Sequence, residues 1–455
     1  MPDQPNTVPA PAPQEEPPYP RPLVAWYAVA VLTLVYIFSF IDRQIMSLLV
    51  KPIRAHLGIG DTQMALLIGT SFAIFYTFFG IPLGRLADSR SRRGIIAGGF
   101  FTWSLFTAAC ALAKNFVQML LYRVGVGIGE AALSPAAYSL ITDSFPKERL
   151  ATALSVYSMG IYIGSGMAFL LGGQVVRLAT SRNAWVLPVI GAVQPWQVIF
   201  LIVGLPGVLL ALLLFTIREP VRRGLARHAA ALPAKEVFAY IFRNTRTFLC
   251  HNIGFGMLSL AAYASAAWVP EFFRRVHHWS IPQTGTVYGI LVMTMGPVGL
   301  IVAGRIADHM RARGVRDANM KVGIWIALLS IPVHFGMYLA PSGTMAAIWL
   351  APGCMLAAAP WGIAPAAIQQ MMPNPMRGQA SAVYLFLLNL VGLGIGPTAV
   401  GWVTEHVFGR EDAVNYSLLL VSVVAAVTSA VLLWAGLREY LRSLERLREW
   451  AGERG

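Results

Sequence analysis

Four ionisable residues stand deep inside long apolar stretches of the sequence: Asp42, Arg43, Arg123 and Glu130. If those stretches cross a lipid bilayer, each charge there costs at least about 2.5–3.5 kcal/mol and needs a partner or a cavity. A buried carboxyl group holds a proton more readily than an exposed one, and a neighbouring arginine opposes this effect. A site that alternates between the two environments can take up a proton on one side and release it on the other. These residues therefore indicate proton-coupled movement of a solute.

The composition supports a membrane setting for these charges. The chain has 455 residues, of which 56% are hydrophobic and only 12% are Asp, Glu, Lys or Arg. Soluble domains contain roughly 25% of these charged residues, because polar side chains must cover their surface. The mean hydropathy is +0.61. The outside of this protein must therefore face lipid, which excludes a disordered chain, a disulfide-rich secreted scaffold and an ordinary cytosolic enzyme.

Twelve apolar segments follow one another along the chain, and each is long enough to cross a hydrocarbon core of about 30 Å as a helix. Their continuous apolar runs do not fit the alternating pattern of an outer-membrane barrel. The sequence thus predicts an all-α polytopic membrane protein with twelve transmembrane helices. The approximate spans are 24–50, 62–87, 94–113, 116–143, 150–176, 196–217, 247–273, 284–308, 319–339, 345–372, 378–404 and 413–437.

The basic residues fix the expected orientation. If both termini are cytoplasmic, 25 of the 35 Lys and Arg residues fall in the inner segments and 8 in the outer loops. This bias favours cytoplasmic N and C termini and places the protein in the inner membrane of a cell. It also accounts for the net charge of +14 without a nucleic-acid partner. The cysteines Cys110, Cys250 and Cys354 lie in apolar runs without metal-ligand spacing, so neither a metal nor a cofactor is expected.

The longest inner connection divides the chain into two halves of six spans. The expected units are a disordered, Pro-rich cytoplasmic tail (1–22), an N-terminal half (23–217), a cytoplasmic linker (218–246), a C-terminal half (247–437) and an amphipathic helix (438–455). Leucines at helical spacing with arginines between them predict that this last helix lies on the inner leaflet, and a solvated helical tail is the alternative.

The two halves share sequence motifs. Gly84-Arg85-Leu86-Ala87-Asp88 follows the second span, and Gly304-Arg305-Ile306-Ala307-Asp308 follows the eighth. Further along, Ser134-Pro135-Ala136-Ala137 corresponds to Ala364-Pro365-Ala366-Ala367. Two parallel, pseudo-symmetric six-helix halves are typical of a transporter with a central site between them.

These motifs resemble those of a known family. GRLADSRSRR is similar to the loop between spans 2 and 3 of the major facilitator superfamily, and GRIADHMRAR resembles a degenerate copy of it. The resemblance covers nearly the whole chain. FSFIDRQIMSLLV in span 1 and YRVGVGIGEAALSPAAYSLITDSFP in span 4 resemble the spinster family within it. The resemblance implies export of lipid-like amphiphiles, such as lysophospholipids or phosphorylated sphingosine, coupled to protons in bacterial members.

The loop motif also implies a gate at the inner end. Asp88 can accept hydrogen bonds from a neighbouring helix N-terminus or pair with an arginine when the inner side closes. Gly84 allows close backbone approach, and Arg92 and Arg93 can reach Asp143. In the second half Gly304, Arg305 and Asp308 are expected to act in the same way. The alternative is that the arginines only mark the cytoplasmic side.

In the proton-coupling site, neighbouring residues on a helix point about 100° apart, so Asp42 and Arg43 cannot face one spot. We expect Arg43 to pair with Asp42 or Glu130, depending on conformation and protonation. Glu130 is the first candidate for the proton carrier and Asp42 the second. The alternative is a static ion pair that fixes helix packing. Arg123 either contacts an anionic headgroup or snorkels to the outer interface.

Polar and aromatic residues in the spans are expected to line the substrate cavity. Because the second half has almost no charge in mid-membrane, an amphiphile would place its headgroup near Arg43 and Glu130 and its tail toward the C-terminal half. The substrate-binding candidates are Arg43, Glu130, Arg123, Tyr36, Phe75, Tyr157, Tyr263, Trp268, Tyr384 and Asn389.

Other functions remain open on the sequence. The first alternative is a proton-coupled carrier of a small organic anion, a sugar or a drug-like solute, although a sugar site needs more mid-span amides than this chain has. A receptor or scaffold that no longer transports is a second alternative. A membrane enzyme is disfavoured, because no catalytic constellation stands out. The expected partners are the substrate, protons and the bilayer, and the expected state is a monomer.

Overall fold

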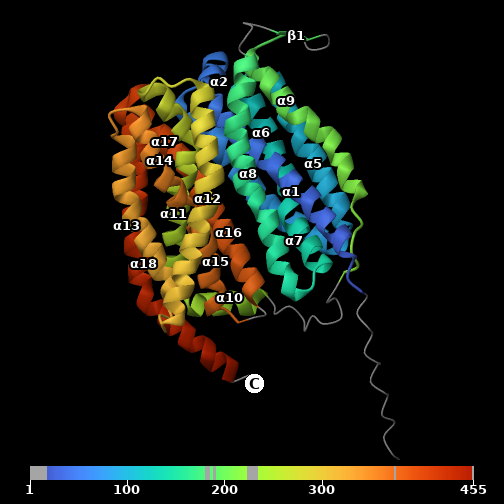
Figure 1. Cartoon of the computed structure of the whole chain (residues 1–455), viewed down its shortest axis with the longest axis vertical. Helices are drawn as coiled ribbons and strands as arrows, with labels where there is room; N and C mark the ends of the chain where they lie inside the picture. Colours follow the sequence, from blue (N-terminus) through green and yellow to red (C-terminus); the bar gives the residue numbers. More distant parts are fainter. Residues whose placement is uncertain (1–17, 180–184, 188–190, 223–233, 374–375, 453–455) are drawn as a thin grey trace, which may run out of the picture.

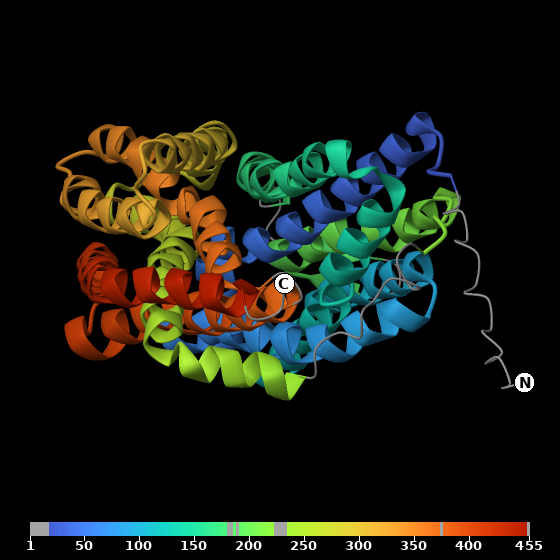
Figure 2. The same cartoon turned by 90° about the horizontal axis from the view of Figure 1, so that it is seen from below.

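The structure is a computed structural model that describes residues 18–179, 185–187, 191–222, 234–373 and 376–452. Within this part of the chain, twelve helical segments are long and apolar enough to cross a membrane. They form two bundles that stand side by side, with the first and second halves of the sequence in separate bundles (Figures 1 and 2). The prediction of twelve membrane-spanning helices in two halves is confirmed.

The six spans of the N-terminal half include two interrupted helices. Span 2 contains a π-helical segment, Leu66–Thr70, and span 4 breaks after Glu130. The helices are α1 (Pro22–Gln44), α3 (Asp61–Ala65) with α4 (Ser71–Ser89), α5 (Arg92–Ala109), α6 (Phe116–Glu130) with α7 (Leu133–Ser144), α8 (Lys147–Ala179) and α9 (Pro195–Leu210).

The C-terminal half also contains two interrupted helices. Span 10 breaks just before Pro360, and span 11 contains the π-helical segments Asn389–Ile395 and Val403–Phe408. The helices are α11 (Thr245–Val276), α12 (Ile281–Ala312), α13 (Ala318–Tyr338), α14 (Gly343–Ala358) with α15 (Pro360–Met371), α16 (Arg377–Leu388) with α17 (Gly396–Trp402), and α18 (Val414–Gly452).

Short elements lie at the two ends of the bundles. α1 begins and α18 ends at the same end, which we call the inner end, and α10 (Ala234–Arg243) lies across it (Figures 1 and 2). The opposite, outer end carries α2 (Val50–Leu57) and an antiparallel hairpin. This hairpin pairs β1 (Trp185–Leu187) with β2 (Gly191–Val193).

Two of the expected boundaries differ in the structure. The break expected near residue 437 does not occur, because α18 continues to Gly452 and its inner part packs on the protein. Tyr440 is fully buried and donates to the Ala367 carbonyl, and Ser443 hydrogen-bonds to Asn244. The expected linker contains α10, while 223–233 and residues 1–17 of the expected tail lie outside the described residues.

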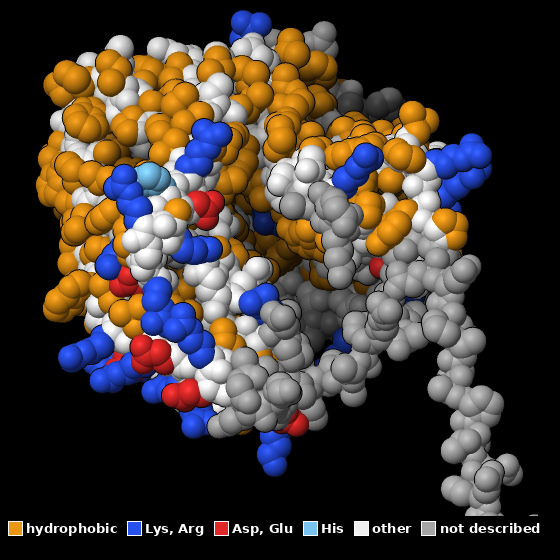
Figure 3. Space-filling model, turned by 60° about the horizontal axis from the view of Figure 1, so that its bottom comes forward, with side chains coloured by type: hydrophobic (Ala, Val, Ile, Leu, Met, Phe, Trp, Pro, Cys, Tyr) orange, Lys and Arg blue, Asp and Glu red, His pale blue; other side chains and the backbone are white. Residues whose placement is uncertain are grey.

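The core shows how the two halves contact each other. At the outer end, buried apolar residues of both halves form a single cluster, in which Met64 and Ile68 join Trp268 and Val400. At the inner end, two separate clusters lie one in each half, apart from Leu393. The space-filling view shows the inner face hollowed between the halves (Figure 3). The protein is therefore closed at the outer end and open at the inner end.

Glycines bring α8 and α12 together across the outer half of this interface. A Cβ atom on Gly285 would lie 2.3 Å from the Phe169 carbonyl oxygen, so only glycine fits without a backbone shift. Nearer the inner end, Gly304 on the same helix has open space around it. The contact between the halves thus depends on backbone approach at a few positions of α12.

We predict that Gly285→Ala destabilises the protein by about 1–3 kcal/mol, because the added methyl group forces the two helices apart. Gly304→Ala is the matched control on the same helix and should be neutral or stabilising by up to about 1 kcal/mol, because alanine favours a helix. Thermal unfolding of the purified protein checks both variants. Equal melting temperatures for the two would contradict the packing argument.

Candidate transport site

An ion pair between Arg43 and Glu130 lies inside the N-terminal half. Arg43 Nη2 is 2.6 Å and Nε 2.7 Å from Glu130 Oε2. The Glu130 side chain is fully buried, whereas 12% of the Arg43 side chain remains exposed. Glu130 is the last residue of α6. Pro135, near the start of α7, has no backbone N–H to donate to the preceding turn, and span 4 is broken between the two helices. The break in span 4 thereby holds this carboxylate at a fixed place in the bundle.

Aromatic rings surround the Arg43 guanidinium. Its central carbon lies 4.9 Å from the ring centre of Phe40, 4.5 Å from Phe72 and 4.9 Å from Tyr76. Ring faces attract a cation, and the attraction increases where water is excluded. Arg43 is therefore held by one carboxylate and three rings, and no hydrogen bond to Asp42 is present.

Asp42 points away from this pair, as the helical spacing predicts. It is 1% exposed, and its Oδ2 accepts from Thr107 Oγ1 of α5 at 3.3 Å. Among the described residues, its Oδ1 has no hydrogen-bond partner. Of the two partners expected for Arg43, the structure brings Glu130 to it and holds Asp42 on a different helix face.

Arg123 does not reach the outer interface, so the snorkelling alternative is wrong for this structure. The residue is fully buried, and its Nε donates to the Leu67 carbonyl at 3.2 Å beside the π-helical segment of span 2. Its guanidinium lies 5.7 Å from the Phe72 ring. Within the described part of the chain, Nη1 and Nη2 have no hydrogen-bond partner. Arg123 is therefore surrounded by a carbonyl group and an aromatic ring in the protein interior, and not by the lipid headgroup region.

The aromatic candidates for the substrate cavity differ in their surroundings. Tyr36 stacks on Tyr157 at 4.6 Å between ring centres, and both belong to the inner cluster of the first half. Phe75 and Tyr263 are half-buried, and Tyr263 contacts Trp361 edge-on. By contrast, Trp268 is fully buried in the apolar cluster at the outer end, and its indole donates to the Pro397 carbonyl. Trp268 is therefore a packing residue here and does not line a cavity.

Two candidates lie on span 11. Tyr384 is 1% exposed and contacts the His251 ring edge-on. Asn389 opens the π-helical segment, is partly buried, and donates to the Leu385 carbonyl of its own helix at 3.0 Å. Its amide is therefore partly used by the local backbone.

At the inner end, Arg92 of α5 connects α7 with the start of the linker between the halves. It is fully buried, pairs with Asp143 of α7, and its Nε lies 3.2 Å from Glu219 Oε1. Its Nη2 also donates to the Pro220 carbonyl. Arg92 reaches Asp143 as expected, but Arg93 instead donates to the carbonyls of Phe215 and Ile217.

The remaining gating candidates are Gly84, Asp88, Gly304, Arg305 and Asp308. A Cβ on Gly84 would lie 3.6 Å from Pro135, and the side chain of Asp88 lies outside what the structure describes. Arg305 and Asp308 are exposed at the open inner end. In the second half, with the Gln370 oxygen turned toward it, Arg311 Nη1 donates to Gln370 at 3.0 Å.

A cluster of charges at the outer end is not predicted by the sequence patterns. Arg275 and Glu271, on the last turns of α11, are buried with Asp61 of the other half. Arg275 follows directly after an apolar run, as a residue of an outer loop would. Its spacing of four residues from Glu271 was the available signal, because such pairs contact each other on a helix.

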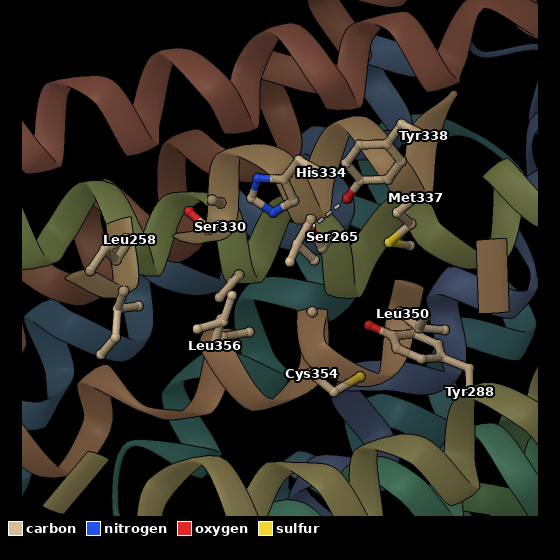
Figure 4. A pocket seen from close by; sticks show the side chains of 16 residues that line it. Leu258, Ser265, Tyr288, Ser330, His334, Met337, Tyr338, Leu350, Cys354 and Leu356 are labelled. Carbon is tan, nitrogen blue, oxygen red and sulfur yellow. Dashed lines mark hydrogen bonds between the residues drawn. The ribbon is translucent and has the colours of Figure 1, made fainter. Parts of the chain in front are cut away.

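A small cavity lies elsewhere, inside the C-terminal half (Figure 4). It has a volume of about 60 Å³ and lies between α11, α12, α13 and α14. Ser265 and Tyr338 hydrogen-bond to each other at its wall, and His334 stacks on Tyr338. This cavity shares no lining residue with the Arg43–Glu130 pair.

Comparison with known proteins agrees with this architecture. Residues 32–397 match the sequence profile of the Major Facilitator Superfamily, and the chain belongs to this family. It is similar to the spinster transporters within the family. An inward-facing, unoccupied crystal structure of a bacterial homologue of the human lysosomal transporter spinster superposes with a TM-score of 0.80. The two chains are 27% identical, and the match covers 93% of this chain and 99% of the other.

Two curated relatives have the same range of identity. An MFS-type efflux pump of Mycolicibacterium smegmatis is 28% identical over 93% of this chain and 95% of its own. Protein spinster homolog 1 of Homo sapiens is 26% identical over 89% of this chain and 79% of its own. The fold and the family are those of multi-pass membrane transporters, which in bacteria lie in the inner membrane. Such a transporter acts on a small-molecule substrate.

One contact at the inner end has a pH dependence that can be tested. Partial burial raises the pKa of the Glu219 carboxyl, but hydrogen bonds from Ser91 and Arg92 outweigh burial and hold the pKa below its usual value. A carboxyl group whose pKa is lowered in the folded state stabilises that state above its unfolded pKa, and this stabilisation is lost as the pH falls through the folded pKa.

We predict that the melting temperature of the wild type falls between about pH 5 and pH 3, and that Glu219→Gln flattens this part of the profile. The variant should also melt at a lower temperature than the wild type at pH 7. Asp412→Asn, which changes an exposed carboxylate at the outer end, is the control and should follow the wild type. Identical profiles for Glu219→Gln and the wild type would contradict the assignment.

Proposed function

We propose that this transporter is proton-coupled and moves a lipid-like amphiphile by alternating access. The observation that carries the proposal is the buried Arg43–Glu130 pair inside its shell of aromatic rings. A permanent ion pair could be replaced by apolar residues at little cost in stability, so its presence at membrane depth favours a functional role.

The proposed coupling follows from the charges of the pair. Glu130 accepts both contacts from Arg43 through the same oxygen, Oε2, and in the described structure its Oε1 has no hydrogen-bond partner. Protonation of Glu130 removes the negative charge that holds Arg43. The guanidinium then becomes available to an anionic or zwitterionic headgroup, and loss of the proton restores the original pair. The Glu130 carboxylate and the substrate headgroup therefore compete for Arg43, and protonation of Glu130 favours the headgroup. Asp42 is the second proton carrier in this proposal.

The surroundings of the pair favour an amphiphile. Arg43 is the partly exposed member of the pair, and Phe40, Phe72 and Tyr76 give it an apolar wall. On the facing half, Tyr263 and Trp361 are half-buried and present further aromatic surface. The ionised residues of the second half lie toward the ends of its spans. A headgroup at Arg43 and a tail along the C-terminal half fit this division.

A second candidate substrate is a drug-like solute. The Mycolicibacterium smegmatis relative is named as an efflux pump, and its match covers most of both chains. An aromatic shell around a single cation–carboxylate pair also suits an amphipathic organic molecule without an acyl chain. The two candidates differ in tail length, and a transport assay can separate them.

We predict that wild-type protein in liposomes moves a labelled lysophospholipid in response to an imposed pH gradient, and that Glu130→Gln abolishes this gradient-driven movement. Glutamine keeps the shape of the side chain but cannot give up a proton. Substrate binding should persist in the variant, because Arg43 is then no longer held by a carboxylate. The exposed carboxylate variant Glu445→Gln is the matched control and should transport like the wild type.

Full gradient-driven uptake by a folded Glu130→Gln variant would exclude Glu130 as the proton carrier. Movement of an amphipathic organic cation or anion, but not of the lysophospholipid, would favour the drug-like solute. A melting curve of each variant verifies that it is folded.

A further inference from the structure

The outer end of the interface is held by six charged side chains. Asp61 accepts from Arg275 Nη1 at 2.7 Å and from Nη2 at 2.8 Å, across the boundary between the halves. Glu271 accepts from Arg275 Nε at 2.6 Å and from Arg274 at 2.9 Å, within α11. Arg54 lies 2.8 Å from Asp61 and 3.0 Å from Glu411. We call these six residues the outer cluster: Arg54, Asp61, Glu271, Arg274, Arg275 and Glu411.

Arg275 is the central member of this cluster. Its side chain is 3% exposed, as are those of Asp61 and Glu271. Arg275 and Arg54 each contact a carboxylate of both halves, but the contact of Arg54 with Glu411 across the boundary is far more exposed than that of Arg275 with Asp61. Charge-assisted, bidentate bonds of this kind are among the strongest side-chain contacts. The bonds between Arg275 and Asp61 form only while the two halves meet at the outer end.

The cluster divides into two neutral sets when the halves separate. The N-terminal half carries Arg54 and Asp61, which already contact each other. The C-terminal half carries Arg274 and Arg275 with Glu271 and Glu411. Each set has equal numbers of positive and negative charges, so separation leaves no net charge on either face. After separation, Asp61 remains paired with Arg54, and Arg275 remains paired with Glu271.

We propose that Arg275 is a two-position latch of the outer gate, bound to Asp61 when the outside is closed and to Glu271 alone when it is open. This inference rests on the proposed alternating-access function. Glu271 holds Arg275 at the gate in the open state, which prevents a buried, unpaired charge. The energetic difference between the two states is thus limited to the contacts that cross the boundary.

Other bonds at the outer end support the closed state but do not replace the latch. The Thr62 backbone N–H donates to Glu405 Oε2 at 2.8 Å, and Thr70 Oγ1 contacts the Gly394 carbonyl at 2.5 Å and Thr398 at 2.7 Å. Among the described residues, the ion pairs and side-chain hydrogen bonds between the halves all lie at this end. Arg275 contributes the most buried of these ion pairs.

The test measures hydrogen exchange by mass spectrometry on the full chain in lipid nanodiscs. Arg275→Gln should increase exchange at the outer segments 58–66 and 403–413 and should raise the outward-open population at least about tenfold, the size of a lost charged hydrogen bond. Arg274→Gln is the matched control, because Arg274 is the neighbouring arginine on Glu271 but does not contact Asp61. It should leave the exchange of both segments unchanged.

Glu271→Gln should change hydrogen exchange at the outer segments in the opposite direction, and this distinguishes a latch from a simple gate. Without Glu271, Arg275 has no carboxylate partner in the open state but keeps Asp61 in the closed state, so exchange at the outer segments should fall below the wild-type value. Asp61→Asn should open the gate as Arg275→Gln does. If Arg275→Gln does not fold, Asp61→Asn and Glu271→Gln carry the test by their opposite signs.

Equal exchange in Arg275→Gln and Arg274→Gln would overturn the proposal, and so would increased outer exchange in Glu271→Gln. This readout does not depend on the substrate or on protons. If the liposome assay shows no pH-driven transport while the exchange changes occur as expected, the proposed coupling fails and the latch stands. If transport is proton-driven but the exchange of the variants is unchanged, the latch fails and the proposed function stands.

Discussion

The cost of placing a charge inside an apolar bundle is the constraint on which this structure depends. It explains why Glu130 and Arg43 contact each other, and why the rings of Phe40, Phe72 and Tyr76 gather around the guanidinium. It also explains the form of span 4, which breaks where the carboxylate must reach its partner. Helix breaks at membrane depth are tolerated where the freed backbone groups face the interior of a protein. The charge pair and the interrupted helix are two aspects of one arrangement.

The same constraint acts differently at the two ends of the molecule. At the outer end, charges from both halves neutralise one another within a shared apolar cluster. At the inner end, Arg92 satisfies its charge without reaching the other half, through Asp143 of its own half and Glu219 at the start of the linker. Contacts inside one half can persist while the halves move, whereas contacts between the halves must break. The distribution of ion pairs thus separates a rigid part of each half from a part that changes during transport.

The sequence predicted the fold well, because its signals are local. A run of apolar residues specifies a spanning helix without reference to the rest of the chain, and the recurrence of Gly84–Asp88 at Gly304–Asp308 predicts two halves. The pairing of Arg43 with a carboxylate was predictable, because an unpaired charge inside the membrane has a high free-energy cost. Trp268 and Arg123 were harder, because the side a residue faces depends on neighbours far away in sequence. The carbonyls of Pro397 and Leu67 that receive their N–H groups give no signal in the sequence. Arg275 was missed for the same reason, since Asp61 is 214 positions away.

The π-helical segments of spans 2 and 11 have a mechanical consequence. Leu66–Thr70 and Asn389–Ile395 lie against each other at the boundary between the halves, where Thr70 contacts Gly394. A π-helical turn contains one extra residue relative to the α-helix. Forming or losing such a turn therefore changes the register of the helix beyond it by one residue, which is about 100° of rotation and about 1.5 Å of rise. Two neighbouring spans that carry such turns can reorient their inner parts while their outer parts keep their register.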